Sequence, residues 1–274
     1  RGIEYNVSGD NSLVKNDMHS ERMAYDKMGN IIKLSRNGLG NLRRIDDLTF
    51  SYNGNQIKSI VDYAGSQNMY SVKEYQNKAN EATEFFYDAN GNLITDLDRD
   101  VVTIRYNLLN LPDTVQFKNG SQIINQYDAG GQKLQSDYLT PLIPLVLPVA
   151  NGEIRELIDY SRSGTRYVGN HTYGTLEIMP TVYEYVRDKT YNSEGYTTYG
   201  FFEATGMYYY RRDHLGNNRE VCLAPPSGGW GAATTIQRTQ YYPSGLPWAE
   251  GLNPEAQNKK YNGKEFIEAH GLDE

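Results

Sequence analysis

The sequence has little cysteine and no long apolar run. Its 274 residues contain a single cysteine, Cys222, so no disulfide can form within the chain. The longest apolar stretch, residues 139–150, is interrupted by Pro141, Pro144 and Pro148. That stretch is too short and too broken to cross a bilayer, so the sequence predicts no membrane span.

Basic clusters are also missing. The chain carries 27 Lys and Arg against 34 Asp and Glu, a formal net charge of −7, with no basic run. Nucleic-acid-binding surfaces concentrate basic residues, so no nucleic-acid partner is expected. The chain starts at Arg1, so we expect a piece of a longer protein, in which the lack of a targeting signal is uninformative.

Tyrosine and glycine are abundant, with 24 Tyr and 26 Gly against 7 Phe and 2 Trp. Tyrosine favours half-buried pleated surfaces, and glycine favours tight turns. This composition indicates an all-β protein.

A hairpin pattern occurs twice between Phe85 and Phe117. In the first copy Tyr87 precedes the turn Asp88–Asn92, where the Asp side chain can cap backbone N–H groups and where Asn90 and Gly91 tolerate a positive φ. In the second copy apolar residues alternate up to Tyr106, and the turn follows at once. Alternation ended by turn residues predicts antiparallel hairpins.

Further copies lie at Tyr25, Tyr52 and Tyr127, with turns at Asp26–Asn30 and Asp128–Gln132 in the first and last. Two strands and two turns occupy about 20 residues. The repeat therefore predicts antiparallel hairpin repeats that form a twisted, spiralling β-sheet, an open array with exposed strand edges.

The expected organisation has three parts. Residues 1–138 are the hairpin array, residues 139–150 are a Pro-rich connector, and residues 151–274 form a second, less regular β region. Asn253-Pro254-Glu255 is typical of a helix start, so one short helix is expected near residues 254–259.

Three motifs in the second region accompany the Tyr-Asp repeats: Tyr210–Asn217 (YRRDHLGN), Tyr241–Gly245 (YYPSG) and Tyr261–Glu265 (YNGKE). In this order, together with the repeats at Tyr25 and Tyr87, they resemble the Rhs/YD-repeat family, especially its bacterial members. The last three motifs look like the start of that family's repeat-associated core domain.

The resemblance implies a strand-turn-strand ribbon that spirals into a hollow shell. In the C subunits of insecticidal Tc toxins, such a shell encloses a C-terminal toxin that an aspartyl autoprotease releases, whereas in teneurins it serves cell adhesion. The implied partners are missing flanking repeats and a C-terminal toxin or effector. Relatives run on past a motif like His270-Gly271-Leu272, and no Asp-Pro dipeptide occurs here, so no protease aspartate carries over.

No residue set predicts a catalytic, cofactor or metal site. Asp213 and His214 are adjacent, which on a strand points them to opposite faces, so we expect Asp213, His214 and Arg212 to brace a turn. Cys222 has no neighbouring His or Cys, which argues against zinc. The other histidines are scattered: His19, His171 and His270.

Asp96, Asp98 and Asp100 alternate along the chain and could attract Ca²⁺ from one strand face. The spacing fails the EF-hand pattern, so a solvated acidic turn is the favoured interpretation. The loop Pro225–Gly231 lacks the Lys-Ser/Thr end of a phosphate-binding loop.

The leading hypothesis is a non-catalytic, encapsulating scaffold of a secreted or cell-surface bacterial protein. The alternative is a carbohydrate-binding or adhesion module, in which exposed tyrosines stack on surface glycans. Cross-strand packing is the favoured role of the repeat tyrosines. Open strand edges would pair with flanking repeats or with another copy.

We predict that the purified chain does not cleave itself, because it contains no Asp-Pro dipeptide and so no protease aspartate carries over from the family it resembles. Incubation followed by mass spectrometry should show the intact mass only. A discrete, time-dependent fragment that persists with protease inhibitors directed at contaminants would contradict this prediction.

Overall fold

The computed structural model describes residues 2–7, 13–38, 44–64, 75–143, 145–149, 153–179, 182–200, 204–225, 232–248, 251–253 and 256–266. Side chains are described from residue 18 onward, except at residue 179. The Gly-rich loop at residues 226–231, His270 and Pro254–Glu255 lie outside the described residues.

The described chain is nearly all antiparallel β-structure in two open sheets, which confirms the predicted fold class. Strands follow each other in chain order in both sheets. The five-stranded sheet contains β1 (Gly2–Val7), β2 (Leu13–Tyr25), β3 (Ile31–Asn37), β4 (Arg44–Asn53) and β5 (Gln56–Asp62).

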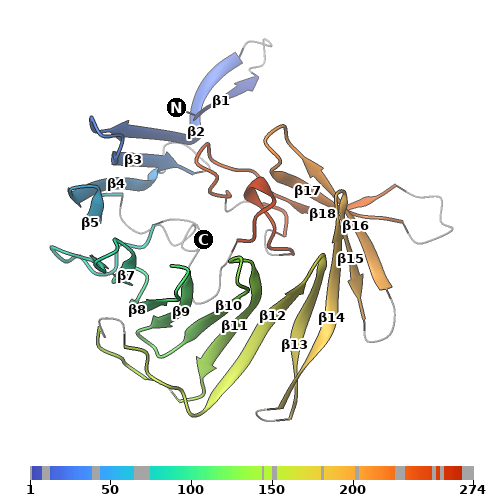
Figure 1. The fold of residues 1–274 in the computed structure, drawn as a ribbon. Coiled ribbons are helices and arrows are strands. Elements are labelled where there is room, and N and C mark those ends of the chain that lie inside the picture. Colours follow the sequence, from blue (N-terminus) through green and yellow to red (C-terminus); the bar gives the residue numbers. More distant parts are fainter. Residues whose placement is uncertain are drawn as a thin grey trace.

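The thirteen-stranded sheet continues from there. Its strands are β6 (Phe85–Tyr87), β7 (Leu93–Asp96), β8 (Val101–Tyr106), β9 (Pro112–Phe117), β10 (Gln122–Tyr127), β11 (Lys133–Pro141), β12 (Tyr160–Val168), β13 (His171–Met179), β14 (Val182–Asn192), β15 (Gly195–Tyr199), β16 (Ala204–Arg212), β17 (Asn218–Leu223) and β18 (Thr234–Arg238). Figure 1 shows the strands following one another around an arc, with the described part of the C-terminal segment, coloured red, inside it.

One five-residue turn connects most hairpins, and Asp88–Asn92 shows its chemistry. Asp88 Oδ1 accepts the backbone N–H groups of Asn90 and Asn92 at 2.9 and 2.8 Å, and Asp88 Oδ2 accepts Asn92 Nδ2 at 2.9 Å. The φ angle is positive at Gly91 (85°) and not at Asn90, contrary to our expectation for Asn90. A type I turn followed by one left-handed residue fits a hairpin with a bulge.

The same turn recurs with the same two backbone hydrogen bonds. It occurs at residues 26–30, 88–92, 107–111, 117–121, 128–132, 213–217, 242–246 and 260–264. Its fourth residue has positive φ every time, being glycine everywhere except Asn110. Pairing register shifts at the strand residue before the turn, for example at Tyr25, Tyr87 and Tyr106, as a bulge requires.

Because the strands form a meander, connections alternate between two rims. The connections β2–β3, β4–β5, β6–β7, β8–β9, β10–β11, β12–β13, β14–β15 and β16–β17 share one rim, which we call the turn rim. All of them are short, from residues 54–55 to the five-residue turns. Longer connections, such as residues 63–84 and 142–159, lie at the opposite rim.

Tyrosine hydroxyls join several hairpins to the one before. The tyrosine that precedes a turn donates to the carbonyl just after the preceding turn: Tyr52 to Ile31 (2.7 Å), Tyr87 to Ile57 (3.0 Å), Tyr106 to Leu93 (2.7 Å), Tyr127 to Pro112 (3.1 Å) and Tyr241 to Asn218 (2.9 Å). These bonds bear out a packing role across strands for Tyr52, Tyr87, Tyr106 and Tyr127, whereas Tyr25 is exposed and its hydroxyl contacts Met23 Sδ at 3.1 Å.

The two sheets meet at β5 and β6. The backbone N–H of Glu84 donates to the Lys58 carbonyl at 2.8 Å, and the buried Glu84 carboxylate accepts the Ile60 N–H at 2.8 Å. Phe85 packs into one cluster with Leu34, Leu48 and Ile60 of the smaller sheet. A second cluster (Val101, Ile104, Val115, Phe117, Ile123) spans β8 to β10. The ribbon therefore continues across the joint.

The expected division at residues 139–150 stays a prediction. Within the structure β11 runs to Pro141 and pairs with β12 over residues 135–141 and 160–166, so the sheet continues past the first connector residues. Leu147 is buried, and its N–H donates to Lys118 O at 2.7 Å.

The short helix expected near residues 254–259 is instead a single 3₁₀ turn at Tyr261–Gly263. Residues 256–259 are not helical, because their polar groups bond elsewhere. The Gln257 N–H donates to Gln237 Oε1 at 3.1 Å, and the Lys259 N–H donates to Gln257 Oε1 at 2.6 Å. Tertiary contacts override the local helix-start signal.

We predict that Tyr87→Phe lowers the free energy of unfolding by about 0.5–1.5 kcal/mol, because it removes one hydrogen bond at the joint. Tyr209→Phe is the matched control, since the structure shows no hydrogen bond of the Tyr209 hydroxyl to a described residue. Urea denaturation measures both. Equal losses in the two variants would contradict the role of the Tyr87 hydroxyl.

Because carboxylates cap the turns, we expect the stability of the fold to depend on pH. Burial raises the pKa of Asp213, but hydrogen bonds from Asn217 and Arg219 outweigh it and bring the pKa to about 2. Folding therefore favours the ionised form, and the stabilisation present above pH about 4 is lost as the pH falls towards 2.

Asp213→Asn should accordingly lower Tm by roughly 2–5 °C at pH 7 and by much less near pH 2. Asp113→Asn, which removes an exposed ion pair with Arg105, is the control and should change Tm less. Thermal melts across pH 2–7 test this. A pH-independent loss in Asp213→Asn would show that the charge is not responsible.

Candidate functional site

The C-terminal segment, residues 239–266, lies inside the arc of strands (Figure 1). Its first part is fixed to the smaller sheet by buried polar groups. Ser244 donates to the Glu21 carboxylate from both N–H (2.9 Å) and Oγ (2.7 Å), and Tyr242 Oη donates to the Asn37 carbonyl at 2.9 Å. These contacts join residues more than 200 positions apart, and we call them the clamp.

Charged and aromatic groups surround the clamp. Arg36 bridges Glu21 (2.8 Å) and Asp46 (2.9 Å), both almost fully buried. His19 stacks on Trp248 with ring centroids 3.6 Å apart. A buried ion pair is costly to break because it leaves a charge without its partner. The clamp is therefore a specific contact.

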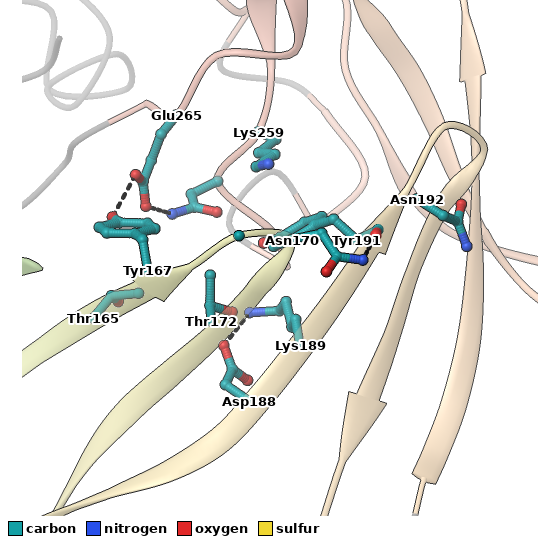
Figure 2. Close-up of a pocket in the computed structure, with 12 residues that line it drawn as sticks. Thr165, Tyr167, Asn170, Thr172, Asp188, Lys189, Tyr191, Asn192, Lys259 and Glu265 are labelled. Carbon is teal, nitrogen blue, oxygen red and sulfur yellow. Dashed lines mark hydrogen bonds and ion pairs between the residues drawn. The ribbon is translucent and has the colours of Figure 1, made fainter. Parts of the chain in front are cut away.

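The other end of the segment covers a polar pocket of about 400 Å³ on β12–β14 and their turns. Figure 2 shows Lys259 and Glu265 on the segment side and Thr172, Lys189 and Asp188 on the strand side. The pocket is lined by Thr165, Tyr167, Gly169, Asn170, Thr172, Asp188, Lys189, Tyr191, Asn192, Asn258, Lys259 and Glu265.

Strand register builds the floor of the pocket. Tyr167 lies opposite Thr172, and Thr172 lies opposite Lys189, across β12, β13 and β14. Cross-strand partners share one face of a sheet. Lys189 Nζ pairs with Asp188 at 2.8 Å, and Asn170 Nδ2 donates to the Tyr191 carbonyl at 2.8 Å.

Hydrogen bonds from the turn rim hold residues 259–262, which cover the pocket. Asn218 donates from Nδ2 to the Lys259 carbonyl at 2.8 Å, and its N–H donates to Lys260 O at 3.1 Å. Asn262 N–H donates to Asn217 Oδ1 at 2.9 Å. The five-residue turn at 213–217 thus positions Lys259 over the strands.

The pKa values of several ionisable side chains in the pocket are shifted. Lys259 Nζ lies 3.6 Å from the centroid of the Tyr191 ring. Burial lowers the pKa of Lys259, the nearby Glu265 carboxylate opposes that shift, and the cations Arg212 and Lys189 reinforce it. Burial also raises the pKa values of Tyr167 and Tyr191. Tyr167 Oη donates to Glu265 at 2.7 Å.

This arrangement suits binding of a small polar molecule, because it offers a partly open hollow lined by hydrogen-bonding groups. Among the described residues, no three His, Cys, Asp or Glu side chains gather closely enough to hold a metal ion. No described helix has the length and apolar character needed to cross a membrane.

Asp213 braces its turn, as expected. Its carboxylate accepts N–H groups of Leu215 and Asn217 at 3.0 Å and Arg219 Nε at 2.8 Å. Arg212 donates to Ser193 O and Asn218 Oδ1. His214 is exposed in the same turn. That these residues have no catalytic role stays a prediction.

The three acidic residues differ from our expectation of one solvated turn. Asp96 and Asp98 are buried, and only Asp100 is exposed. Asp98 Oδ1 accepts the N–H groups of Lys78 and Ala79, both at 2.9 Å, and Asp98 Oδ2 accepts the Tyr75 hydroxyl. The chain crossing from β5 to β6 covers these carboxylates, which local spacing could not reveal.

The cysteine and the histidines considered in the sequence analysis do not come together in one site. Cys222 is buried on β17 with Thr235 Oγ1 3.8 Å from its Sγ. His171 Nδ1 contacts Thr190 Oγ1 at 2.8 Å on β14, whereas His19 belongs to the clamp.

Sequence reasoning missed the pocket because its residues come from three stretches, 165–172, 188–192 and 258–265. The one available signal was the motif Tyr261–Glu265, which supplies Glu265 and begins two residues after Lys259. No local pattern tells which strands that motif covers.

No protein-family model and no curated protein matches the chain. A crystal structure of TcdB2-TccC3-Cdc42 is similar with a TM-score of 0.52 and 13% identity, covering 98% of this chain and 15% of that chain. A crystal structure of TcdB2-TccC3-TEV has a TM-score of 0.45 and 12% identity, and the match covers 99% of this chain and 17% of that chain. The first likeness shows a shared fold, and this chain spans about a sixth of the length of these structures.

We predict that Glu265→Gln lowers the pKa of Lys259 further, because a neighbouring anion that favours the ammonium form is removed. NMR titration of ¹³C-methylated lysines measures this pKa directly. Glu177→Gln, on exposed β13 surface, is the control and should leave Lys259 unchanged. An unchanged Lys259 pKa in Glu265→Gln would place the carboxylate outside its electrostatic reach.

Proposed function

We propose that this chain is a segment of an encapsulating β-scaffold, structural rather than catalytic, whose full ribbon encloses a polypeptide. One observation carries the proposal: the clamp holds the C-terminal segment against the start of the ribbon, so that the sheet curls around its own interior. The likeness in fold to TcdB2-TccC3-Cdc42 supports it.

The sequence motifs give the proposal its finer content. Their resemblance to the Rhs/YD-repeat family suggests a bacterial, secreted or cell-surface protein with a C-terminal toxin or effector as its cargo. The outer strands β1 and β18 end their sheets, and we propose that flanking repeats pair with β1, because an open edge otherwise invites association with other chains.

The carbohydrate-binding alternative has less support. The hydroxyls of Tyr87, Tyr106 and Tyr127 donate to backbone carbonyls inside the ribbon, so they cannot donate to a sugar at the same time. A glycan-array screen with no binding would remove this alternative.

Protection of the cargo tests the scaffold. The reading frame beyond Glu274 should continue into a further domain, and a stop codon there would contradict the enclosure of a cargo. In the full gene product, limited proteolysis should leave that domain intact long after the isolated domain has been digested.

Breaking the clamp should open the enclosure. Because Glu21 accepts two hydrogen bonds from Ser244 and pairs with Arg36, Glu21→Gln in the full gene product should speed digestion of the cargo. Glu177→Gln is the matched control and should protect as the wild type does. Equal digestion rates for free and enclosed cargo would overturn the proposal.

A further inference from the structure

The pocket beneath Lys259 contains a buried hydroxyl with no hydrogen-bond partner. Thr172 is only 7% exposed and lines the pocket, and its Oγ1 makes no hydrogen bond to any described residue. Buried hydroxyls are nearly always partnered, since an unmet one costs free energy. A ligand in the pocket would supply the missing partner.

The Lys259 ammonium likewise forms no ion pair with any residue that the structure describes. It lies over the face of the Tyr191 ring, and no carboxylate of a described residue lies within ion-pair distance. Glu265 is the nearest candidate, but its oxygens already accept Tyr167 Oη and Asn258 Nδ2. The N–H donors of Lys259 that do not face the Tyr191 ring are therefore available to an acceptor in the pocket.

The charges around the pocket leave one positive charge in excess. Three cations, Lys189, Lys259 and Arg212, face two carboxylates, Asp188 and Glu265. Lys189 is neutralised by Asp188, and Arg212 is engaged by Ser193 and Asn218. Lys259 is the group left to attract an anion.

We propose that this pocket binds a carboxylate, held by Lys259, on a ligand that also bonds to Thr172 Oγ1. Charge-assisted hydrogen bonds are stronger than neutral ones, and Lys forms them readily with carboxylates. The volume of about 400 Å³ fits a molecule of the size of a sugar acid or of a single amino-acid residue. The carboxylate comes either from a free hydroxy acid or from an acidic side chain of a polypeptide. The proposal does not depend on the scaffold function.

Paired probes test the chemistry on the complete chain. ¹⁵N-labelled protein is titrated with glucuronate and glucose, and with N-acetylglutamate N-methylamide and its glutamine counterpart. At least one acid should shift the amide signals of β12–β14, with its neutral partner at least about tenfold weaker. Glucuronate alone would identify a free hydroxy acid, and the capped glutamate alone a polypeptide side chain.

Variants separate the pocket from general charge effects. Lys259→Met should weaken the acid about tenfold or more, Lys259→Arg should retain most of the affinity, and Thr172→Val should weaken it by a smaller factor. Lys118→Met, at an exposed lysine on the opposite rim, is the control and should bind as the wild type does.

Three outcomes would overturn the proposal. They are equal binding of acids and neutral partners, no acid binding up to about 10 mM, and undiminished binding by a folded Lys259→Met. If Lys259→Met fails to fold, Lys259→Arg together with Thr172→Val decides, because loss of binding in Lys259→Arg with native melting would also contradict the assignment.

Discussion

The hydrogen bond from a tyrosine hydroxyl to the carbonyl after the preceding turn is the contact on which the rest of the structure depends. It links hairpins that the strand ladder alone would leave free to slip, because a ladder fixes neighbours but not the spacing of successive turns. The turn itself is set by a carboxylate or amide cap and a left-handed fourth residue. Together these two local devices produce one ordered rim.

That rim gives the C-terminal segment a place to bind. Asn217 and Asn218, at the end of one such turn, hold the backbone of residues 259–262. The segment then covers strands that precede it by about a hundred residues, as the bond from Tyr167 to Glu265 shows. At its other end the clamp reaches the first strands of the ribbon. The interior of the arc is therefore filled by the chain itself, at least in part.

The repeat made the hairpins predictable. Tyr87 and Asp88, or Tyr127 and Asp128, combine the strand end and the turn cap in adjacent residues, so short-range rules suffice. The same rules failed for Asn253–Glu255, because partners such as Gln237 compete for the polar groups of the following residues. They failed again at Asp98, whose burial comes from a chain crossing twenty residues earlier.

The sequence by itself determined the hairpins, their turns and the all-β ribbon, because each depends on side chains a few residues apart. Tertiary structure alone decided how the ribbon curls, that Glu21 meets Ser244, and that Lys259 lies over Tyr191 beside Thr172. Those contacts join distant stretches through the accumulated twist of many strands. A small change in twist at each strand would move them apart, and no local pattern records that sum.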